Sequence, residues 1–513
     1  MKRFIVLTLA MVALVGIMAP AAFAQAPPAA PPLKFDINGF LDTVSSYSKN
    51  LRDLNFTRSG DTEWYARNRG RFNIEGRAGN AVVVWGIEID TVWGQTGAAD
   101  NNLAAGNPAQ RAGATSAFDL NTDVQGSVET KWLFAEFDMP LMPFATRVRV
   151  GAQPYSVTYK ICALACSDFA GVNFSTTWSP NVKSHITFAQ IEEELSGPST
   201  GGGAAPAGLL GDDFAFIASV EISPFKGLDI RPIYAYASFE GTTSGAARVA
   251  VSNGVIAGNP AFGTSTRDHE SRHTLGVDLR WRSGPFSVEP TFLYQFGSRD
   301  MTDPFAGGQA EADISAWLFD IKAGWRIGPL LLEFRGMSTT GNRPKDQLTQ
   351  DVNYYQPITG DTGWWSDGWG NILALGVDYF NGAFRTLGTG IGLDRYGRKQ
   401  FGFKATYSMT PQLDFYGLVT PAWTARSVDT DGTFTAGAMS CRPTDCQGDS
   451  AYIGTEADLG IVWRFAPGLT LDLVGAILFA GSALDTTEIV GGVANKRDAQ
   501  NVYTGAARLR VSF

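Results

Sequence analysis

The feature that most constrains this chain is an alternation of apolar and polar residues with a period of two, which recurs from Lys34 to Phe513. Between residues 286 and 296, every second side chain is apolar or aromatic, and most of those in between are polar. Successive side chains of an extended strand point to opposite faces of a sheet. The pattern therefore predicts an all-β chain in which each strand has one apolar and one polar face.

The connections between these segments alternate strictly between short and long. The short connections lie near residues 79–80, 140–145, 179–182, 224–227, 283–285, 327–329, 410–411 and 466–468. The long connections lie near residues 48–62, 96–127, 157–168, 193–212, 241–272, 299–313, 340–399, 425–453 and 482–502. Short periplasmic turns and long extracellular loops are typical of transmembrane barrels. We therefore predict a transmembrane antiparallel β-barrel of about 18 strands over residues 34–513, with both termini in the periplasm.

The beginning of the chain predicts export. Lys2 and Arg3 precede an apolar run, and residues 22–24 form an A-x-A cleavage site. This order is typical of a signal peptide. We place the signal peptide at residues 1–24 and a Pro/Ala-rich spacer at residues 25–33.

The last strand, residues 503–513, alternates between an apolar and a polar face and ends on Phe513. In this the sequence resembles bacterial outer-membrane barrels, whose last strand characteristically ends in an aromatic residue read by the insertion machinery. Over the whole mature chain it resembles the large porin-like barrels of the 18-stranded group, which contains OprD-type porins and alginate-export barrels. The resemblance is one of architecture and includes no substrate motif. It implies the outer membrane of a Gram-negative bacterium, contact with outer-membrane lipid, and insertion through Phe513.

Tryptophans mark one end of the predicted strands. Trp178, Trp281, Trp325 and Trp463 each come just before a short connection, on the face predicted to be apolar. Indole rings are enriched where a membrane meets water. These four residues therefore predict that the short turns lie at one surface of the membrane.

The opposite face of the strands carries many charges. The residues that we predict to line the lumen are Arg67, Arg69, Arg71, Glu88, Asp90, Arg147, Arg149, Asp278, Arg280, Asp320, Glu333, Arg335, Asp458, Arg508 and Arg510. Burying unpaired ions is costly, so this face predicts a water-filled lumen. The mixture of signs predicts no strong preference for cations or anions.

The connection at residues 79–80 also predicts a register. A two-residue loop that begins with glycine suits a type II′ hairpin turn. The opposed pairs are then Ala78–Ala81, Arg71–Glu88, Arg69–Asp90 and Arg67–Val92. We expect Arg69 and Arg71 to be compensated by the acidic residues that face them. Arg67 faces an apolar residue, so we expect its charge to be uncompensated and available to anions.

The segment 340–399 leaves two interpretations open. Residues 371–380 and 384–394 have apolar character around the hairpin signal at 381–382, so they could form two further strands and make 20 in all. Alternatively, the segment folds into the lumen. We prefer this interpretation, because 20 strands would need a very short extracellular loop at 395–399. Unusually long loops are commonly functional, so we expect this one to narrow the pore.

Residues 269–273 match the H-E-x-x-H motif of zinc hydrolases. That chemistry needs a helix, which places both imidazoles on one face. Here the match adjoins an alternating strand, so we expect an extended backbone and interpret the match as coincidental. The chain has 3 histidines in all. We predict no catalytic site, no metal site and no cofactor.

Four cysteines form two close pairs in predicted extracellular loops. Cys162 lies near Cys166, and Cys441 lies near Cys446. In an oxidising compartment such pairs favour local disulfides. We therefore predict one disulfide in each of these two loops.

The predicted function is a channel for passive diffusion of small hydrophilic solutes or ions through the outer membrane, and not an enzyme. The formal net charge of −9 argues against a nucleic-acid partner. Two alternatives remain open: a polymer-export barrel, whose lumen would carry one dominant charge, and a barrel that sheathes a partner protein. A homo-oligomer is compatible with each of these functions.

Overall fold

The structure is a computed structural model. It describes residues 33–51, 56–57, 61–93, 128–159, 163–193, 212–240, 267–302, 309–343, 346, 351–358, 369–373, 396–428, 430, 448–490 and 493–513. The predicted signal peptide and nearly all of the predicted spacer lie outside the described residues. No helix in the described part of the chain is long and apolar enough to cross a membrane.

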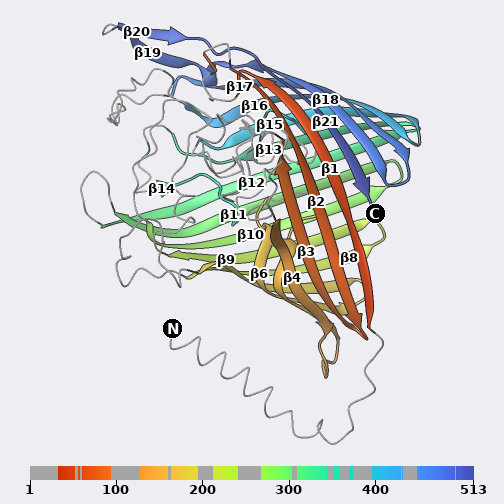
Figure 1. Cartoon of the computed structure of the whole chain (residues 1–513). Helices are drawn as coiled ribbons and strands as arrows, with labels where there is room; N and C mark the ends of the chain where they lie inside the picture. Colours follow the sequence, from red (N-terminus) through yellow and green to blue (C-terminus); the bar gives the residue numbers. More distant parts are fainter. Residues whose placement is uncertain are drawn as a thin grey trace, which may run out of the picture.

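Long strands dominate the described residues (Figure 1). The strands are β1 (Lys34–Lys49), β2 (Thr62–Ala78), β3 (Ala81–Val92), β4 (Val128–Asp138), β5 (Ala145–Ser156), β6 (Cys166–Ser179), β7 (Val182–Glu193), β8 (Asp212–Phe225), β9 (Leu228–Glu240), β10 (Arg267–Ser283), β11 (Phe286–Thr302), β12 (Gln309–Ile327), β13 (Leu330–Thr339), β15 (Arg398–Thr410), β16 (Leu413–Val428), β17 (Ser450–Ala466), β18 (Leu469–Ala480) and β21 (Val502–Ser512). Shorter elements are β14 (Asp351–Val352), the 3-10 helix η2 (Ser482–Leu484), and the hairpin of β19 (Thr486–Val490) and β20 (Val493–Arg497).

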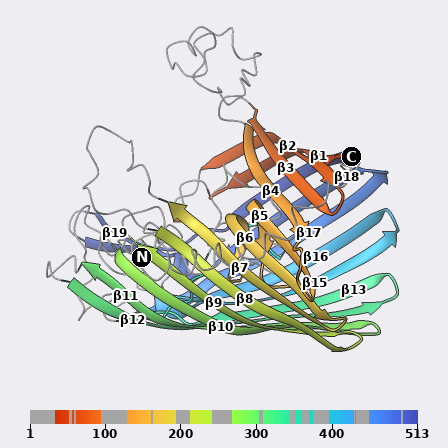
Figure 2. The ribbon, with the colours of Figure 1, turned by 90° about the horizontal axis from the view of Figure 1, so that it is seen from below.

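The long strands form a closed antiparallel barrel. One sheet contains 19 strands, of which β14 is a two-residue strand parallel to β12, so 18 strands make the ring in the described part of the chain. β1 pairs with β2 along one edge and with β21 along the other, which closes the ring between its first and last strands. The strands run obliquely around the barrel (Figure 2). The predicted barrel of about 18 antiparallel strands is therefore confirmed.

The turns follow the predicted pattern. Each of the eight predicted short connections joins two consecutive strands of the ring, and the described strand ends that flank the predicted long connections lie at the opposite end. At that opposite end, the hairpin of β19 and β20 extends beyond the rim (Figure 1). Because 18 is an even number, β1 begins and β21 ends on the side of the short turns.

The two faces of the strands differ as the alternation predicts. Along β11, Phe292 and Tyr294 are exposed, whereas Thr291, Leu293 and Gln295 are each at most 1% exposed. The exposed aromatic face lies outside the ring, and the other face points into it. The four tryptophans beside the short turns are also exposed on the outer face, namely Trp178, Trp281, Trp325 and Trp463.

Candidate functional site in the barrel interior

The turn between β2 and β3 sets the register of one interior charge cluster. Gly79 has a φ of +61°, and Asn80 is not among the described non-glycine residues with positive φ. This fits a type II′ turn, in which only the first central residue has positive φ. The opposed pairs are Ala78–Ala81, Arg71–Glu88, Arg69–Asp90 and Arg67–Val92. All four predicted pairs are confirmed.

Ion pairs connect the charged residues of this hairpin. Arg69 forms a two-pronged contact with Asp90, with Nε 2.8 Å from Oδ1 and Nη2 2.7 Å from Oδ2. Its Nη2 also lies 3.2 Å from Glu88 Oε1, and Arg71 pairs with the other oxygen of Glu88. The planar guanidinium suits this geometry because it offers parallel N–H groups to a carboxylate. The predicted compensation of Arg69 and Arg71 is confirmed.

Arg67 differs from its prediction. Its Nη1 lies 3.1 Å from Asp90 Oδ1, and the side chain is 2% exposed. Although Arg67 faces Val92 directly, a long side chain reaches the diagonal neighbour on the same face of a sheet. The prediction that Arg67 is uncompensated and available to anions is therefore wrong.

A second charge cluster lies on β4 and β5, close to a short turn. Arg149 Nη2 lies 2.6 Å from Glu136 Oε2, and Arg147 Nη1 lies 2.8 Å from Asp138 Oδ1. The side chains of Arg147 and Arg149 are 35% and 34% exposed. These cations are therefore paired, but they remain in contact with water.

The other residues predicted to line the lumen contact neighbouring strands or loop segments. Their contacts include Arg280–Asp229 at 2.7 Å, Arg335–Asp320 at 3.3 Å, Glu333–Lys322 at 3.1 Å, Arg508–Asp472 at 2.7 Å, Arg510–Asp42 at 2.5 Å, Asp278–Thr291 at 2.6 Å and Asp458–Asn371 at 2.7 Å. Each of the nine arginines in the predicted set thus has an acidic partner. Five of the predicted residues, Arg67, Asp278, Asp320, Arg335 and Asp458, are at most 2% exposed.

The long connection between β13 and β15 buries some of these interior side chains. Its described residues 353–358 and 369–373 lie inside the ring, and we call them the lumenal insert. β13 pairs directly with β15, so the connection adds no strand between them. The preferred interpretation, an excursion into the lumen, is confirmed for these residues. The candidate strand at 384–394 and most of the one at 371–380 lie outside the described residues.

Polar contacts fix the first part of the insert to the inner face of β10 and β11. The Gln356 main-chain N–H donates to Gln295 Oε1 at 2.9 Å, and Gln295 Nε2 donates to the Gln356 carbonyl at 2.6 Å. Arg299 Nη2 donates to Gln356 Oε1 at 3.0 Å, while its Nε donates to Glu270 Oε2 at 2.7 Å. These contacts pair the main-chain N–H, the main-chain carbonyl and the side-chain Oε1 of Gln356, which suits a buried position.

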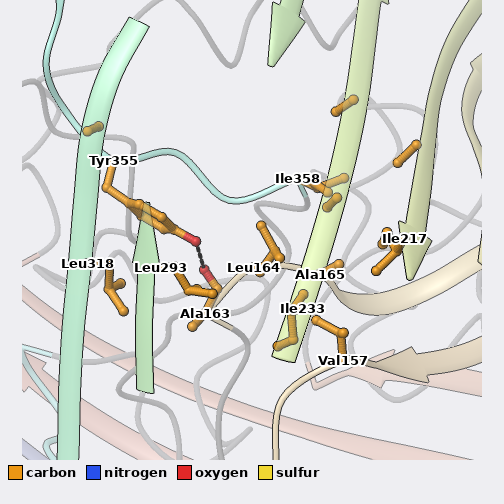
Figure 3. Close-up of a cluster of buried hydrophobic side chains, with 14 of the residues drawn as sticks. Val157, Ala163, Leu164, Ala165, Ile217, Ile233, Leu293, Leu318, Tyr355 and Ile358 are labelled. Atoms are coloured by element: carbon orange, nitrogen blue, oxygen red, sulfur yellow. Dashed lines mark hydrogen bonds between the residues drawn. The ribbon is translucent and has the colours of Figure 1, made fainter. Parts of the chain in front are cut away.

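An apolar layer joins the insert to a second inward-folded loop, which contains Ala163 and Leu164 (Figure 3). The Tyr355 hydroxyl donates to the Ala163 carbonyl at 2.7 Å, and the Ile358 N–H donates to the Leu164 carbonyl at 2.7 Å. Burial raises the pKa of Tyr355, so its hydroxyl keeps the proton that it donates. The wall contributes inward-facing apolar residues to this layer, including Ile217, Ile233, Leu293 and Leu318.

The prediction of a water-filled lumen is therefore wrong for the part that the insert covers. There, polar side chains of the wall are buried by loop segments that bring their own hydrogen-bonding groups. Tyr355 and Gln356 were not predicted as site residues. The one available signal was the run 354–358, Tyr-Tyr-Gln-Pro-Ile, which is unusually apolar for an exposed loop.

The H-E-x-x-H match lies in β10 and is extended, as predicted. His273 faces outward, where its ring stacks on Phe296 at 5.1 Å and its Nδ1 lies 3.0 Å from the Tyr234 hydroxyl. Glu270 is 0% exposed and belongs to the interior. The motif residues therefore lie on both sides of the wall, which separates the second histidine from the glutamate. Among the described residues, no group of three or more histidines, cysteines and acids could hold a metal.

The two predicted disulfides remain predictions. Cys166 begins β6 and is not a free thiol. Cys162, Cys441 and Cys446 lie outside the described residues.

No family model matches the sequence, and no curated protein matches it either. The chain is similar to several solved structures from Pseudomonas aeruginosa. For OccK8 (OprE) the TM-score is 0.48 and the sequence identity 10%, over 93% of this chain and 98% of that one. For OccK1 (OpdK) the values are 0.47 and 11%, over 93% and 99%. For OpdQ they are 0.45 and 10%, over 93% and 98%.

Proposed function

We propose that the protein is an outer-membrane channel through which small hydrophilic solutes or ions diffuse passively. The observation that carries this proposal is a closed ring of 18 strands with aromatic and apolar side chains outside and paired charges inside. An apolar outer band suits contact with lipid, and a charged interior suits water. The tryptophans beside the short turns fit the periplasmic surface of the membrane.

The degree of exposure suggests which predicted residues contact the solute. Those that keep contact with water are Arg71, Asp90, Arg147, Arg149, Arg280, Glu333, Arg508 and Arg510. We assign these residues to the water-filled part of the lumen. The insert and the loop around Leu164 would narrow the pore on the side of the long loops.

A polymer-export barrel is less well supported. Such a lumen would present one dominant charge to the polymer. Here each predicted arginine of the wall has an acidic partner, so the interior offers no uninterrupted track of one sign.

Export by the signal peptide, insertion through Phe513 and the two loop disulfides belong to the same proposal. Phe513 follows the last strand and is 56% exposed, so it is accessible to another protein. Closing so few residues in each cysteine pair would add little stability. Counting free thiols by mass spectrometry of the oxidised protein checks the disulfides, and four free thiols would contradict them.

Conductance of the purified full-length protein in a planar lipid bilayer tests the proposed function. We expect steady single-channel steps whose size scales with salt concentration, because the exposed charges of the interior indicate water. A correctly folded protein that gives no steps over a wide voltage range would contradict the proposal.

A further inference from the structure

The second part of the lumenal insert is held by a buried carboxylate of the wall. Glu456 on β17 is 0% exposed. Its Oε1 accepts the main-chain N–H groups of Asn371 at 2.5 Å and Ile372 at 2.8 Å, and its Oε2 accepts that of Leu373 at 2.7 Å. Three successive main-chain donors therefore converge on one carboxylate. This is the arrangement by which a main-chain concavity binds an anion.

Asp458, two residues further along the same face of β17, holds the same segment. Its Oδ2 accepts the side-chain Nδ2 of Asn371 at 2.7 Å. The Asp458 side chain is 2% exposed and lies beside the carboxyl group of Glu456. A buried polar group that loses a hydrogen-bond partner is costly. The departure of Asn371 would remove one hydrogen-bond partner from Asp458.

The insert has two polar anchors on the wall, one at Gln356 and one at residues 371–373. They differ in which hydrogen-bond and ion-pair partners the wall residues would keep if the insert left the wall. At the first anchor, Glu270 would still be paired with Arg299, since both belong to the wall. At the second, Glu456 would lose all three main-chain donors at once, because they belong to the insert. The main-chain hydrogen bonds that Glu456 accepts are thus all supplied by the insert itself. This makes the position of the insert dependent on that carboxylate.

Apolar contacts act together with this anchor. Ile372 and Leu373 are 0% and 2% exposed and pack in a cluster with Val44, Ile453 and Leu478 on the inner wall. Trp369 lies against Gly402, where an added Cβ would come within 3.2 Å of the indole. The segment 369–373 therefore has a fitted place on the wall, and removing the anchor should loosen it without unfolding the barrel.

We propose that Glu456 and Asp458 form a latch, which holds the lumenal insert against the inner wall and whose loss frees the insert to move. The consequence for the pore rests on the proposed channel function, but the latch itself does not. With the latch engaged, the insert narrows the lumen. With the latch broken, the lumen widens.

The rate of chemical labelling tests the latch without relying on conductance. We would introduce Ile372→Cys into the full-length protein in lipid vesicles and measure its reaction with a water-soluble maleimide. The protein without this substitution provides the blank for the four native cysteines. Because residue 372 is fully buried, labelling reports the fraction of time that the insert is displaced. Adding Glu456→Gln should raise the labelling rate about tenfold or more.

Asp472→Asn is the matched control, because Asp472 is an interior carboxylate on the adjacent β18 that pairs with Arg508. It should leave the labelling rate unchanged. Asn371→Gly, which alters the insert and not the wall, is a second variant and should give a smaller rise. Equal labelling of all variants overturns the latch, as does an equal rise in the Asp472→Asn control.

The same variants separate the latch from the proposed function. Glu456→Gln should also lengthen the time spent at a higher conductance level. If labelling rises but no variant conducts, the latch stands and the channel function fails. If Glu456→Gln does not fold, the labelling rate of Asn371→Gly tests the latch instead: a rise supports it, and an unchanged rate overturns it.

Discussion

Two ion pairs on the same hairpin, β10 and β11, show how differently the two ends of the barrel interior are built. Near the short turn, Arg282 Nη2 lies 3.1 Å from Glu289 Oε1, and the arginine is 63% exposed. Near the long loops, Arg299 Nε lies 2.7 Å from Glu270 Oε2, and both side chains are 0% exposed. The residue types and the strands are the same. The difference is that the lumenal insert packs on Arg299 and leaves Arg282 in water.

This difference has an energetic consequence. An exposed ion pair contributes about 0.2–1 kcal/mol, because water already solvates both charges. Removing one partner of a buried pair costs far more, because the other charge stays buried without compensation. Substitution of a charged residue at the short-turn end of the interior should therefore cost little stability, and this end suits a wide, water-filled entrance to the pore. The long-loop end is a packed region in which charges position a loop.

The largest effect should follow from removing the insert. Replacing residues 344–394 by a short glycine-serine linker should raise the single-channel conductance several-fold, because the packed end of the lumen would then resemble the open end. Planar-bilayer recordings of the folded variant measure this. A conductance equal to that of the intact protein would show that the segment does not restrict the pore.

The next effect concerns stability and compares the two ion pairs directly. Arg299→Ala should lower the free energy of unfolding by roughly 3 kcal/mol, the low end for breaking a buried pair, because Glu270 would lose Arg299 but keep Arg272, whose Nε lies 3.3 Å from Glu270 Oε1. Arg282→Ala should lower it by about 1 kcal/mol or less. Urea unfolding of both variants in the same lipid or detergent provides the measurement. Similar losses in the two variants would refute the division of the interior into a packed and an open end.

The smallest effect concerns ion selectivity. Arg149, which is 34% exposed, should influence passing ions more than Arg67, which is 2% exposed and paired with Asp90. Arg149→Ala should therefore shift the reversal potential toward cation preference by more than Arg67→Ala does. Reversal potentials under a salt gradient measure both shifts. A larger shift for Arg67→Ala would restore the prediction made from the hairpin register alone.

Much of the wall could be predicted from the sequence, because each wall property depends on residues close together in the chain. Alternation assigned the inner and outer faces of β11, and the glycine at residue 79 set the register of β2 and β3. Arg67 shows where such reasoning fails. Its partner Asp90 is a diagonal neighbour, and the length and bend of a side chain decide whether that contact forms.

The interior could be predicted only in part, because its contents come from segments distant in sequence. Gln356 contacts Gln295 and Arg299, about sixty residues earlier, and Asn371 contacts Glu456, more than eighty residues later. No local period links these residues. Glu456 has the inward position that alternation gives it, yet nothing in β17 indicates that it would bind a loop main chain.

The sequence by itself thus determined the barrel: a ring of about 18 alternating strands, the faces that they present, and the end at which the short turns lie. It did so because a strand alternates with a fixed period, and a two-residue turn leaves little freedom of register. Only the tertiary structure decided which interior charges meet water. A charge on the inner face is solvated or buried according to the loop that folds over it, and the path of that loop depends on contacts with many strands at once.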